Sequence, residues 1–452
     1  MAQSQSFDAF SVFCYLLPIQ HVRVRDFPPT TYYLPLPMFH TIRRATKDPF
    51  FRNSALFFSA SMVVAFLNYL FHPVLARLLS LQDFGDVQAI LAMFGILSTI
   101  MGGFSIATVH ASVNCEDQNE CSAVIASLRR TALILILSIF VILTVGSRFF
   151  ATELHFSSPW LFVILGGSLV MGALQIFRTG YLQGQRNFKA VSIANILISG
   201  GRVLFSAVFV LLGWRAFGAS FGILSAQIIS FAYVFCKTRK ILSAHATALS
   251  SERVREELGY VVFFAVSTIF VTALYTTSVL VVKRFFSPEI AGAFSGISTI
   301  ANIVFFATSS FATVLLSSIK RTHANEERRK IFFKATALIS VIGLSFSLLC
   351  LVFPSFITRI LIGARYVPYA YLLPWLVFAF FFASLVNVCV YYSLAMRQKG
   401  LILLAICVSF ALVLLIAIRH DSPLQIAQNY LAINVIALIA MGIFVSRQLK
   451  KV

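Results

Sequence analysis

Acidic residues are scarce in this chain. Only 16 of its 452 residues are Asp or Glu, against 36 Lys or Arg, and none of the 16 falls inside the long apolar runs as we delimit them below. Arginine does enter these runs, most clearly at Arg202 within 190–214. Ionisable groups at membrane depth usually face a cavity or a partner. An interior that admits cations and not carboxylates therefore indicates the handling of an anion.

Charged residues of both signs are also few. They make up 12% of the chain, whereas soluble domains carry about 25%, and 59% of the residues are hydrophobic. A mean hydropathy of +0.88 agrees with a polytopic membrane protein. The net charge of +20 does not indicate nucleic-acid binding, because the basic residues form short clusters between apolar runs rather than one basic face.

The cysteines do not indicate a disulfide framework or a metal site. The seven cysteines are scattered, and only Cys115 and Cys121 share a loop, without a second Cys or His pair nearby to complete a zinc site. We predict no disulfide, no metal site and no cofactor.

Twelve apolar runs are long enough to cross a bilayer, which takes about 20 residues. We expect an all-α integral membrane protein with spans at 54–78, 87–110, 131–149, 160–182, 190–213, 217–236, 259–282, 290–318, 332–353, 368–394, 401–418 and 425–446.

The loops between these spans alternate in charge. One set of loops holds most of the Lys and Arg residues, and by the positive-inside rule it is cytoplasmic, as are both termini. Residues 1–52 form a cytoplasmic tail that we expect to be disordered to about residue 40. Residues 1–37 have no steady helical period and precede a second methionine, Met38, so we expect them to be dispensable.

A short turn recurs in the two halves of the chain. The segment Ser80 to Gly85 and the segment Ser287 to Gly292 superpose with an offset of 207 residues, and both lie just before a span. The copies are six spans apart, so the halves share one orientation and form two parallel six-helix lobes around a central cleft. The predicted divisions are lobes at 53–236 and 259–446, a cytoplasmic linker at 237–258 and a C-terminal tail at 447–452.

The turn sequence Leu79-Ser80-Leu81-Gln82-Asp83-Phe84-Gly85, its echo at 286–292, the twelve spans and the basic interior together carry a family resemblance. Over about residues 40–450 the chain resembles the oligosaccharide flippases of the multidrug/oligosaccharidyl-lipid/polysaccharide exporter superfamily. The resemblance implies two six-helix lobes working by alternating access in the bacterial inner membrane, and no catalytic residues.

The resemblance also implies a substrate. Members of this family move undecaprenyl-diphosphate-linked oligosaccharide repeat units outward for O-antigen, capsule or exopolysaccharide assembly. The expected partners are this lipid-linked substrate, membrane lipid and the polysaccharide polymerase machinery. A central Arg suits such a substrate, because its planar fork of donors matches phosphate oxygens.

Four residues are candidates for substrate binding. Arg202, in the middle of the fifth span, would contact the diphosphate; the alternative is a structural Arg bonded to carbonyls of a neighbouring helix. Arg178, near the cytoplasmic end of the fourth span, would assist entry or simply reach lipid head groups. His72, beside Pro73, would bond a sugar or support a kink. Asn68 would bond a sugar or a neighbouring helix.

Two rival functions remain open. A cation-coupled multidrug exporter normally needs a carboxylate inside the bundle, which this chain offers only if a boundary residue such as Asp86 enters the cleft. A membrane glycosyltransferase or polymerase generally needs acidic external loops. Here the acidic residues expected on that side appear isolated in sequence, namely Asp83, Asp86, Glu153, Glu289 and Asp421.

Overall fold

The computed structural model describes residues 49–114, 118–239, 251–318, 325–396 and 399–450, and every regular element in these ranges is helical. Most of the predicted N-terminal tail and the central part of the predicted linker lie outside the described residues. Twelve described helices have 20 residues or more: α3 (Pro49–Leu78), α4 (Leu81–Asn114), α5 (Gln118–Val145), α7 (Trp160–Gly184), α8 (Phe188–Phe209), α9 (Arg215–Thr238), α10 (Ser251–Phe285), α11 (Pro288–Ser318), α12 (Asn325–Val352), α14 (Leu373–Ala395), α15 (Lys399–Ile418) and α16 (Pro423–Lys450).

The chain is an all-helical membrane protein. Within the described residues, nine stretches are long and apolar enough to cross a membrane. One of them, Phe188–Thr238, contains both α8 and α9, which are joined by the π-helical segment η1 (Val210–Trp214). The chain reverses there at Gly213, whose φ of 90° is accessible to glycine at no steric cost. The stretch is therefore a hairpin of two packed helices.

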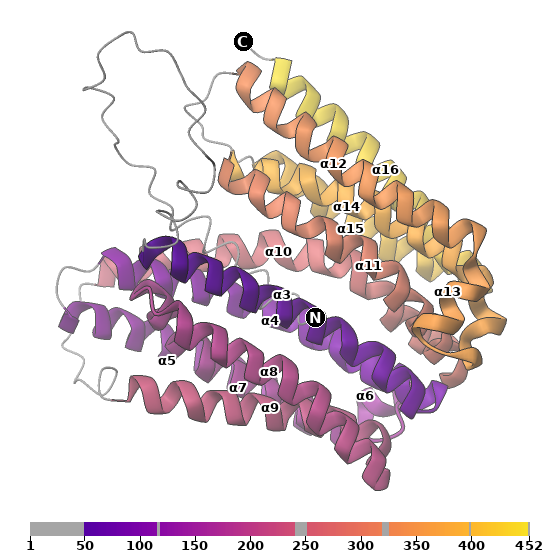
Figure 1. Cartoon of the computed structure of the whole chain (residues 1–452), viewed down its shortest axis with the longest axis horizontal. Helices are drawn as coiled ribbons and strands as arrows, with labels where there is room; N and C mark the ends of the chain where they lie inside the picture. Colours follow the sequence, from indigo (N-terminus) through magenta and orange to yellow (C-terminus); the bar gives the residue numbers. More distant parts are fainter. Residues whose placement is uncertain (1–48, 115–117, 240–250, 319–324, 397–398, 451–452) are drawn as a thin grey trace, which may run out of the picture.

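Short helices mark one end of the molecule, which we call the turn end. It carries α6 (Ser147–Glu153), η1, α13 (Pro354–Leu361) and the 3-10 segment η2 (Ala364–Leu372). The opposite end, the linker end, is where α4, α7, α9, α11 and α14 finish. In Figure 1, α12 and α16 lie close to α13 at the right and diverge from α3, α8 and α9 toward the left.

The helices pack in two groups. Helices α3, α4, α5, α7, α8 and α9 pack on one another, and α11, α12, α14, α15 and α16 form the second group. Close approach of small residues explains part of this packing: a Cβ on Gly222 of α9 would collide with the backbone of Ser206 on α8. Many apolar side chains point outward, such as Leu211 at 71% exposure, as expected for a surface covered by lipid.

Helices α10 and α11 link the two groups. Helix α10 packs on α15 and α11 and also closely on α4 of the first group, and α11 packs on α4 as well. A Cβ on Gly103 of α4 would lie 2.9 Å from the backbone oxygen of Val261 on α10. The two groups of helices are thus joined along the length of α4.

Several helices begin before the spans predicted for them, and two of these differences bear on the site described below. Helix α4 begins at Leu81, six residues before the predicted span at 87, so Asp83 and Asp86 belong to the helix. Helix α10 begins at Ser251, so residues 251–258 of the predicted linker are helical. In both cases the apolar run defines only the lipid-covered part of a longer helix, and the polar extension is held by protein contacts described below.

Candidate functional site

The repeated turns meet each other at the turn end. A Cβ on Gly85, at the start of α4, would lie 2.8 Å from the Cα of Gly292, at the start of α11. A Cβ on Gly292 would overlap the carbonyl oxygen of Leu81. The ring of Phe84 packs edge-on against Tyr366 with 5.9 Å between centroids. The two copies of the repeat therefore touch through equivalent residues, and glycine is required because the backbones approach so closely.

Two arginines at equivalent positions of the repeat also make contacts between the halves at the turn end. Arg77 donates to the carbonyl oxygen of Ile360, and Arg284 pairs with the Glu153 carboxylate at 2.9 Å. Arg284 follows Arg77 by 207 residues (284 − 77), and Ile360 follows Glu153 by the same 207 (360 − 153). Each half thus sends one arginine to the short helix of the other half, which supports the duplication inferred from the turns.

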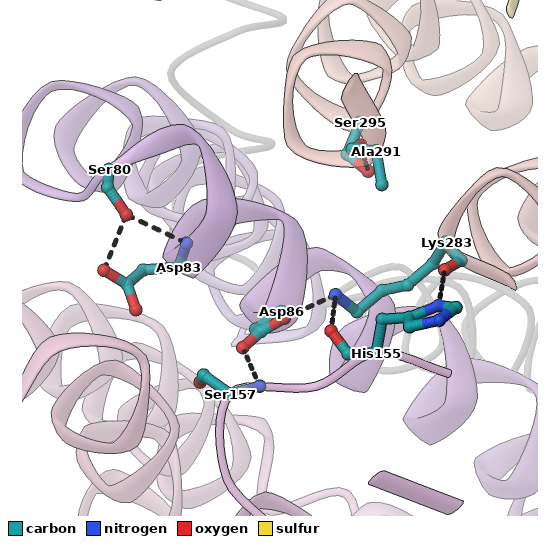
Figure 2. Close-up of polar contacts among 8 residues, drawn as sticks. All are labelled: Ser80, Asp83, Asp86, His155, Ser157, Lys283, Ala291 and Ser295. Carbon is teal, nitrogen blue, oxygen red and sulfur yellow. Dashed lines mark hydrogen bonds and ion pairs between the residues drawn. The ribbon is translucent and has the colours of Figure 1, made fainter. Parts of the chain in front are cut away.

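A buried ion pair breaks this symmetry. Lys283 Nζ of α10 bonds the Oδ1 of Asp86 on α4 at 2.5 Å, and their side chains are 1% and 0% exposed. The other carboxylate oxygen accepts the Ser157 backbone N–H at 2.9 Å. Lys283 Nζ also donates to the His155 carbonyl at 3.2 Å and lies 4.5 Å from the Phe156 ring centroid. Figure 2 shows Lys283 reaching between the His155–Ser157 loop and Asp86.

The residues that correspond to this pair in the other copy are uncharged. An offset of 207 carries Asp86 to Ala293 and Lys283 back to Ala76, and both alanines are buried. The Asp86–Lys283 pair, held by backbone groups of the loop at residues 155–157, therefore joins α4 and α10, and the equivalent helices α11 and α3 have no such pair at these positions. On the other side, between α3 and the α13–η2 segment, exposed Arg365 donates to the carbonyl oxygen of Leu79 at 3.0 Å.

These contacts correct two inferences from the sequence. Three of the acidic residues at this end are paired with basic side chains: Asp83 pairs with Arg215 at 3.0 Å and accepts the Ser80 hydroxyl at 2.7 Å, Asp86 pairs with Lys283, and Glu153 pairs with Arg284. The protein interior does contain a carboxylate, because Asp86 is fully buried, and it lies within Leu81–Val113, a stretch long and apolar enough to cross a membrane. The sequence argument missed it because the apolar run begins one residue later.

Arg202 lies inside the first group of helices. It is 4% exposed, and its guanidinium donates at 3.2 Å to both the backbone and the side-chain oxygen of Asn68 on α3. The guanidinium carbon stands 4.3 Å from the Phe71 ring centroid, and the buried Nε has no hydrogen-bond partner. Arg202 and Asn68 are thus brought together as direct partners, which is the interhelical arrangement considered as an alternative to phosphate binding. Its role toward a substrate stays a prediction.

His72 and Arg178 occupy different surroundings. His72 Nδ1 lies 2.8 Å from the amide nitrogen of Gln88 on α4, one helical turn from Asn68 on α3. Arg178 is half-buried near the linker end, where it donates to the Thr238 hydroxyl at 2.7 Å and stands 4.4 Å from the Phe235 ring centroid. The structure therefore groups Asn68, His72 and Arg202 and leaves Arg178 apart from them.

Sequence reasoning named Asp86 only as a boundary residue that could enter the cleft, and it gave Lys283 no role in a site. Each stands at the edge of an apolar run, where a charge is ordinarily read as a loop residue. The repeat held a usable signal, since aligning the halves sets Asp86 against Ala293 and Lys283 against Ala76. A charged residue that one half of the repeat carries and the other half replaces with alanine indicates a contact that forms at only one of the two equivalent positions.

Solved structures with the same fold are transporters. The chain matches the lipid II flippase MurJ in an inward closed conformation with a TM-score of 0.71 at 14% identity, covering 87% of each chain. It matches the inward-facing conformation of a MATE-family multidrug resistance transporter of the MOP superfamily with a TM-score of 0.70 at 12% identity, covering 85% of this chain and 95% of that one. A MOP superfamily transporter from Pyrococcus furiosus matches with a TM-score of 0.56 at 14% identity, covering 91% and 99%.

At these identities the likeness shows the fold alone, and no curated protein matches the sequence. The family described as Polysaccharide biosynthesis protein matches residues 50–316, which is more than half of the chain. The resemblance drawn from the repeated turn is confirmed by this match. The chain belongs to the polysaccharide biosynthesis protein family.

Proposed function

We propose that the chain is a flippase that moves undecaprenyl-diphosphate-linked oligosaccharide repeat units from the cytoplasmic to the outer leaflet of a bacterial inner membrane, by alternating access of two six-helix lobes. The observation that carries the proposal is membership of the polysaccharide biosynthesis family over residues 50–316, together with helices of the two lobes that diverge toward the linker end (Figure 1). The proposed cargo is large, hydrated and anionic, and it must cross the membrane. Lobes whose helices diverge at one end leave room for it.

The proposed topology has twelve spans with both termini inside. All twelve long helices of the described residues alternate between the linker end and the turn end. Basic residues such as Lys189, Lys237 and Arg255 gather at the linker end. The positive-inside rule makes this end cytoplasmic and the turn end external.

The state of the molecule then follows from its contacts. At the turn end, Gly85 meets Gly292, and Arg77, Arg365 and Lys283 each bond the other half. At the linker end, α12 and α16 diverge from α3 and α8 (Figure 1). This arrangement is closed toward the outside and suits loading of a substrate from the cytoplasm.

The polyprenyl tail also needs a route. Helices α3 and α11 are not among the closely packed helix pairs of the described residues, whereas α4 and α10 are. A head group between the lobes can keep its tail in lipid only if one side between them is open. We assign that side to the α3–α11 seam.

Two arginines are proposed as contacts for the diphosphate. Arg178, half-buried near the linker end, would meet the head group first. Arg202 would meet it deeper, by exchanging its bonds to Asn68 for phosphate oxygens, since its Nε already lacks a partner. An unpaired donor on a buried guanidinium costs free energy that an incoming anion would recover. His72 and Asn68, on the same helix, are proposed to bond the sugar.

The buried carboxylates bear on the rival function. Asp83 and Asp86 are the acidic residues found buried in the described part of the chain, and each is paired with a basic side chain. A cation-coupled exporter would have to free Asp86 from Lys283 before Asp86 could carry a proton or sodium ion. The proposal is therefore transport driven by the membrane potential, which is worth about 2.3 kcal/mol per charge at 100 mV, or about 4–5 kcal/mol for a diphosphate of two charges.

Reconstitution tests this function. The protein in proteoliposomes, supplied with an undecaprenyl diphosphate carrying a labelled disaccharide, should expose the sugar to an added glycosidase at a rate set by a valinomycin-imposed potassium potential. Arg202→Ala should slow exposure by at least about tenfold, and Arg202→Lys should keep part of the rate because the charge remains. Arg186→Ala, at an exposed position, is the matched control.

Each other outcome has a meaning. Exposure no faster than in empty vesicles would remove the flippase proposal. Exposure that ignores voltage but requires a proton or sodium gradient would favour cation coupling, with Asp86 as the candidate carrier. Normal transport by Arg202→Ala would leave Arg202 as an interhelical contact only.

A further inference from the structure

The lobes meet through α4, which packs on both α10 and α11, and the repeat makes two of the seams between the lobes equivalent. One seam is formed by α4 and α10, and the other by α3 and α11, since α10 and α11 follow α3 and α4 by 207 residues. If the halves moved symmetrically, both seams would open and close alike. The contacts along them are not alike.

The α4–α10 seam is joined from end to end. At the turn end, Asp86 and Lys283 form the buried pair already described. In the middle, Gly103 packs against the Val261 backbone, so closely that a Cβ would have no room. At the linker end, His110 Nδ1 lies 2.6 Å from the Glu257 carboxylate. Contacts at three levels leave no end of this seam free to swing away.

Among the described residues, the α3–α11 seam is joined at the turn end. In the described residues, the side-chain hydrogen bonds across it are those of Arg77 and Arg365, both exposed side chains that donate to backbone carbonyls at the turn end. Where the first seam has Asp86 and Lys283, this seam has Ala293 and Ala76. A water-exposed donor on a carbonyl exchanges readily with solvent, so these contacts can break and re-form during each cycle.

The surroundings of the buried pair oppose its separation. Asp86 has both carboxylate oxygens bonded, and Lys283 is held by Asp86, by the His155 carbonyl and by the Phe156 ring. Pulling the two helices apart would leave both charges without these partners in a region away from water. A seam held in this way is suited to stay together while the rest of the interface moves.

We propose that the α4–α10 seam is the hinge of this transporter and that Asp86 and Lys283 are its positioning residues. The lobes turn about this seam, and the turn end opens by separation of α3 from the α11–η2 side. The proposal rests on the alternating access proposed above, and it adds that the movement is one-sided although the fold is duplicated.

Equivalent cysteine pairs test the proposal. In a variant without the seven native cysteines, Glu153→Cys with Arg284→Cys places two accessible thiols across the hinge seam. Arg77→Cys with Ile360→Cys places them at the corresponding positions of the other seam. A short bifunctional thiol reagent then links either pair. A third, temporarily protected cysteine at Ala293, buried in the closed state, reports opening through its reaction with an impermeant maleimide in nanodiscs.

The expected results are opposite for the two pairs. With the 153–284 link, the thiol at position 293 should still be labelled and head-group transport should stay within about twofold of the unlinked protein. With the 77–360 link, labelling and transport should both be lost. Loss of labelling with the 153–284 link, or no labelling in the unlinked protein, would overturn the hinge. The labelling measures opening of the turn end without any substrate. Failure of transport in every sample, including the unlinked one, would therefore count against the flippase function and not against the hinge.

Discussion

The α4–α10 and α3–α11 seams began as copies of one interface and now differ in their chemistry. One holds a fully buried Lys–Asp pair, and the other holds two alanines at the same positions. One is packed from the turn end to the linker end, and the other is bonded at the turn end through exposed arginines. Duplication supplied the shape of the transporter, and divergence at a few positions decided which side can move.

The glycine contact between the seams has stayed symmetric. Gly85 and Gly292 sit where the two copies cross, and each would collide with the other half if it carried a Cβ. At such a crossing both copies face the same steric demand, so both keep glycine. The charged pair lies away from the crossing, where one copy can change without the other.

Removing one charge of the hinge should have the largest effect. Lys283→Ala leaves Asp86 buried without its cation, which should lower the free energy of unfolding by about 3–5 kcal/mol. Thermal unfolding of the purified protein measures the loss, and the amount of protein in the membrane should fall with it. The matched change on the other seam, Arg77→Ala, removes an exposed contact and should cost about 0–1 kcal/mol.

The double variant Asp86→Ala with Lys283→Ala is the control for this effect. It removes both charges and reproduces the alanines of the other seam, so it should recover most of the stability lost by Lys283→Ala. Equal losses for Lys283→Ala and Arg77→Ala would mean that the two seams are energetically alike.

Filling the crossing should have a smaller effect. Gly292→Ala forces the start of α11 away from the Leu81 carbonyl, and overpacking of this kind costs about 1–3 kcal/mol. The same change at Gly172, where no atom lies within 4 Å of the new Cβ, should be neutral or slightly stabilising because alanine favours a helix. Thermal unfolding of both variants makes the comparison. A harmless Gly292→Ala would show that the halves do not meet this closely.

Much of the fold could be predicted from the sequence, because a bilayer makes apolar length a direct guide to helices. The repeated turn also identified Gly85 and Gly292, which the structure brings into contact. Helix ends were harder. The first turns of α4 and α10 are polar, and they stay helical because Asp86 meets Lys283 and Glu257 meets His110, partners that are more than 140 residues away in the chain.

The candidate site was predicted in part. Arg202 and Asn68 were both named from their polarity at membrane depth. Their pairing across α3 and α8 depends on helix packing, which local sequence patterns do not reveal. Asp86 was named only as a boundary residue, because hydropathy places it at the edge of an apolar run, while its burial depends on the second half of the chain. Charges at the edges of apolar runs are thus the residues for which local reasoning is least informative.

Distances across both seams in one sample set test the central claim most directly. Spin labels at 153 and 284, and in a second sample at 77 and 360, can be measured by pulsed electron resonance in nanodiscs with and without the lipid-linked substrate. We predict one distance distribution for the 153–284 pair under both conditions, and a second, longer distance for the 77–360 pair when substrate is present. Equal lengthening of both distances would contradict the account, because it would mean that the two lobes separate symmetrically.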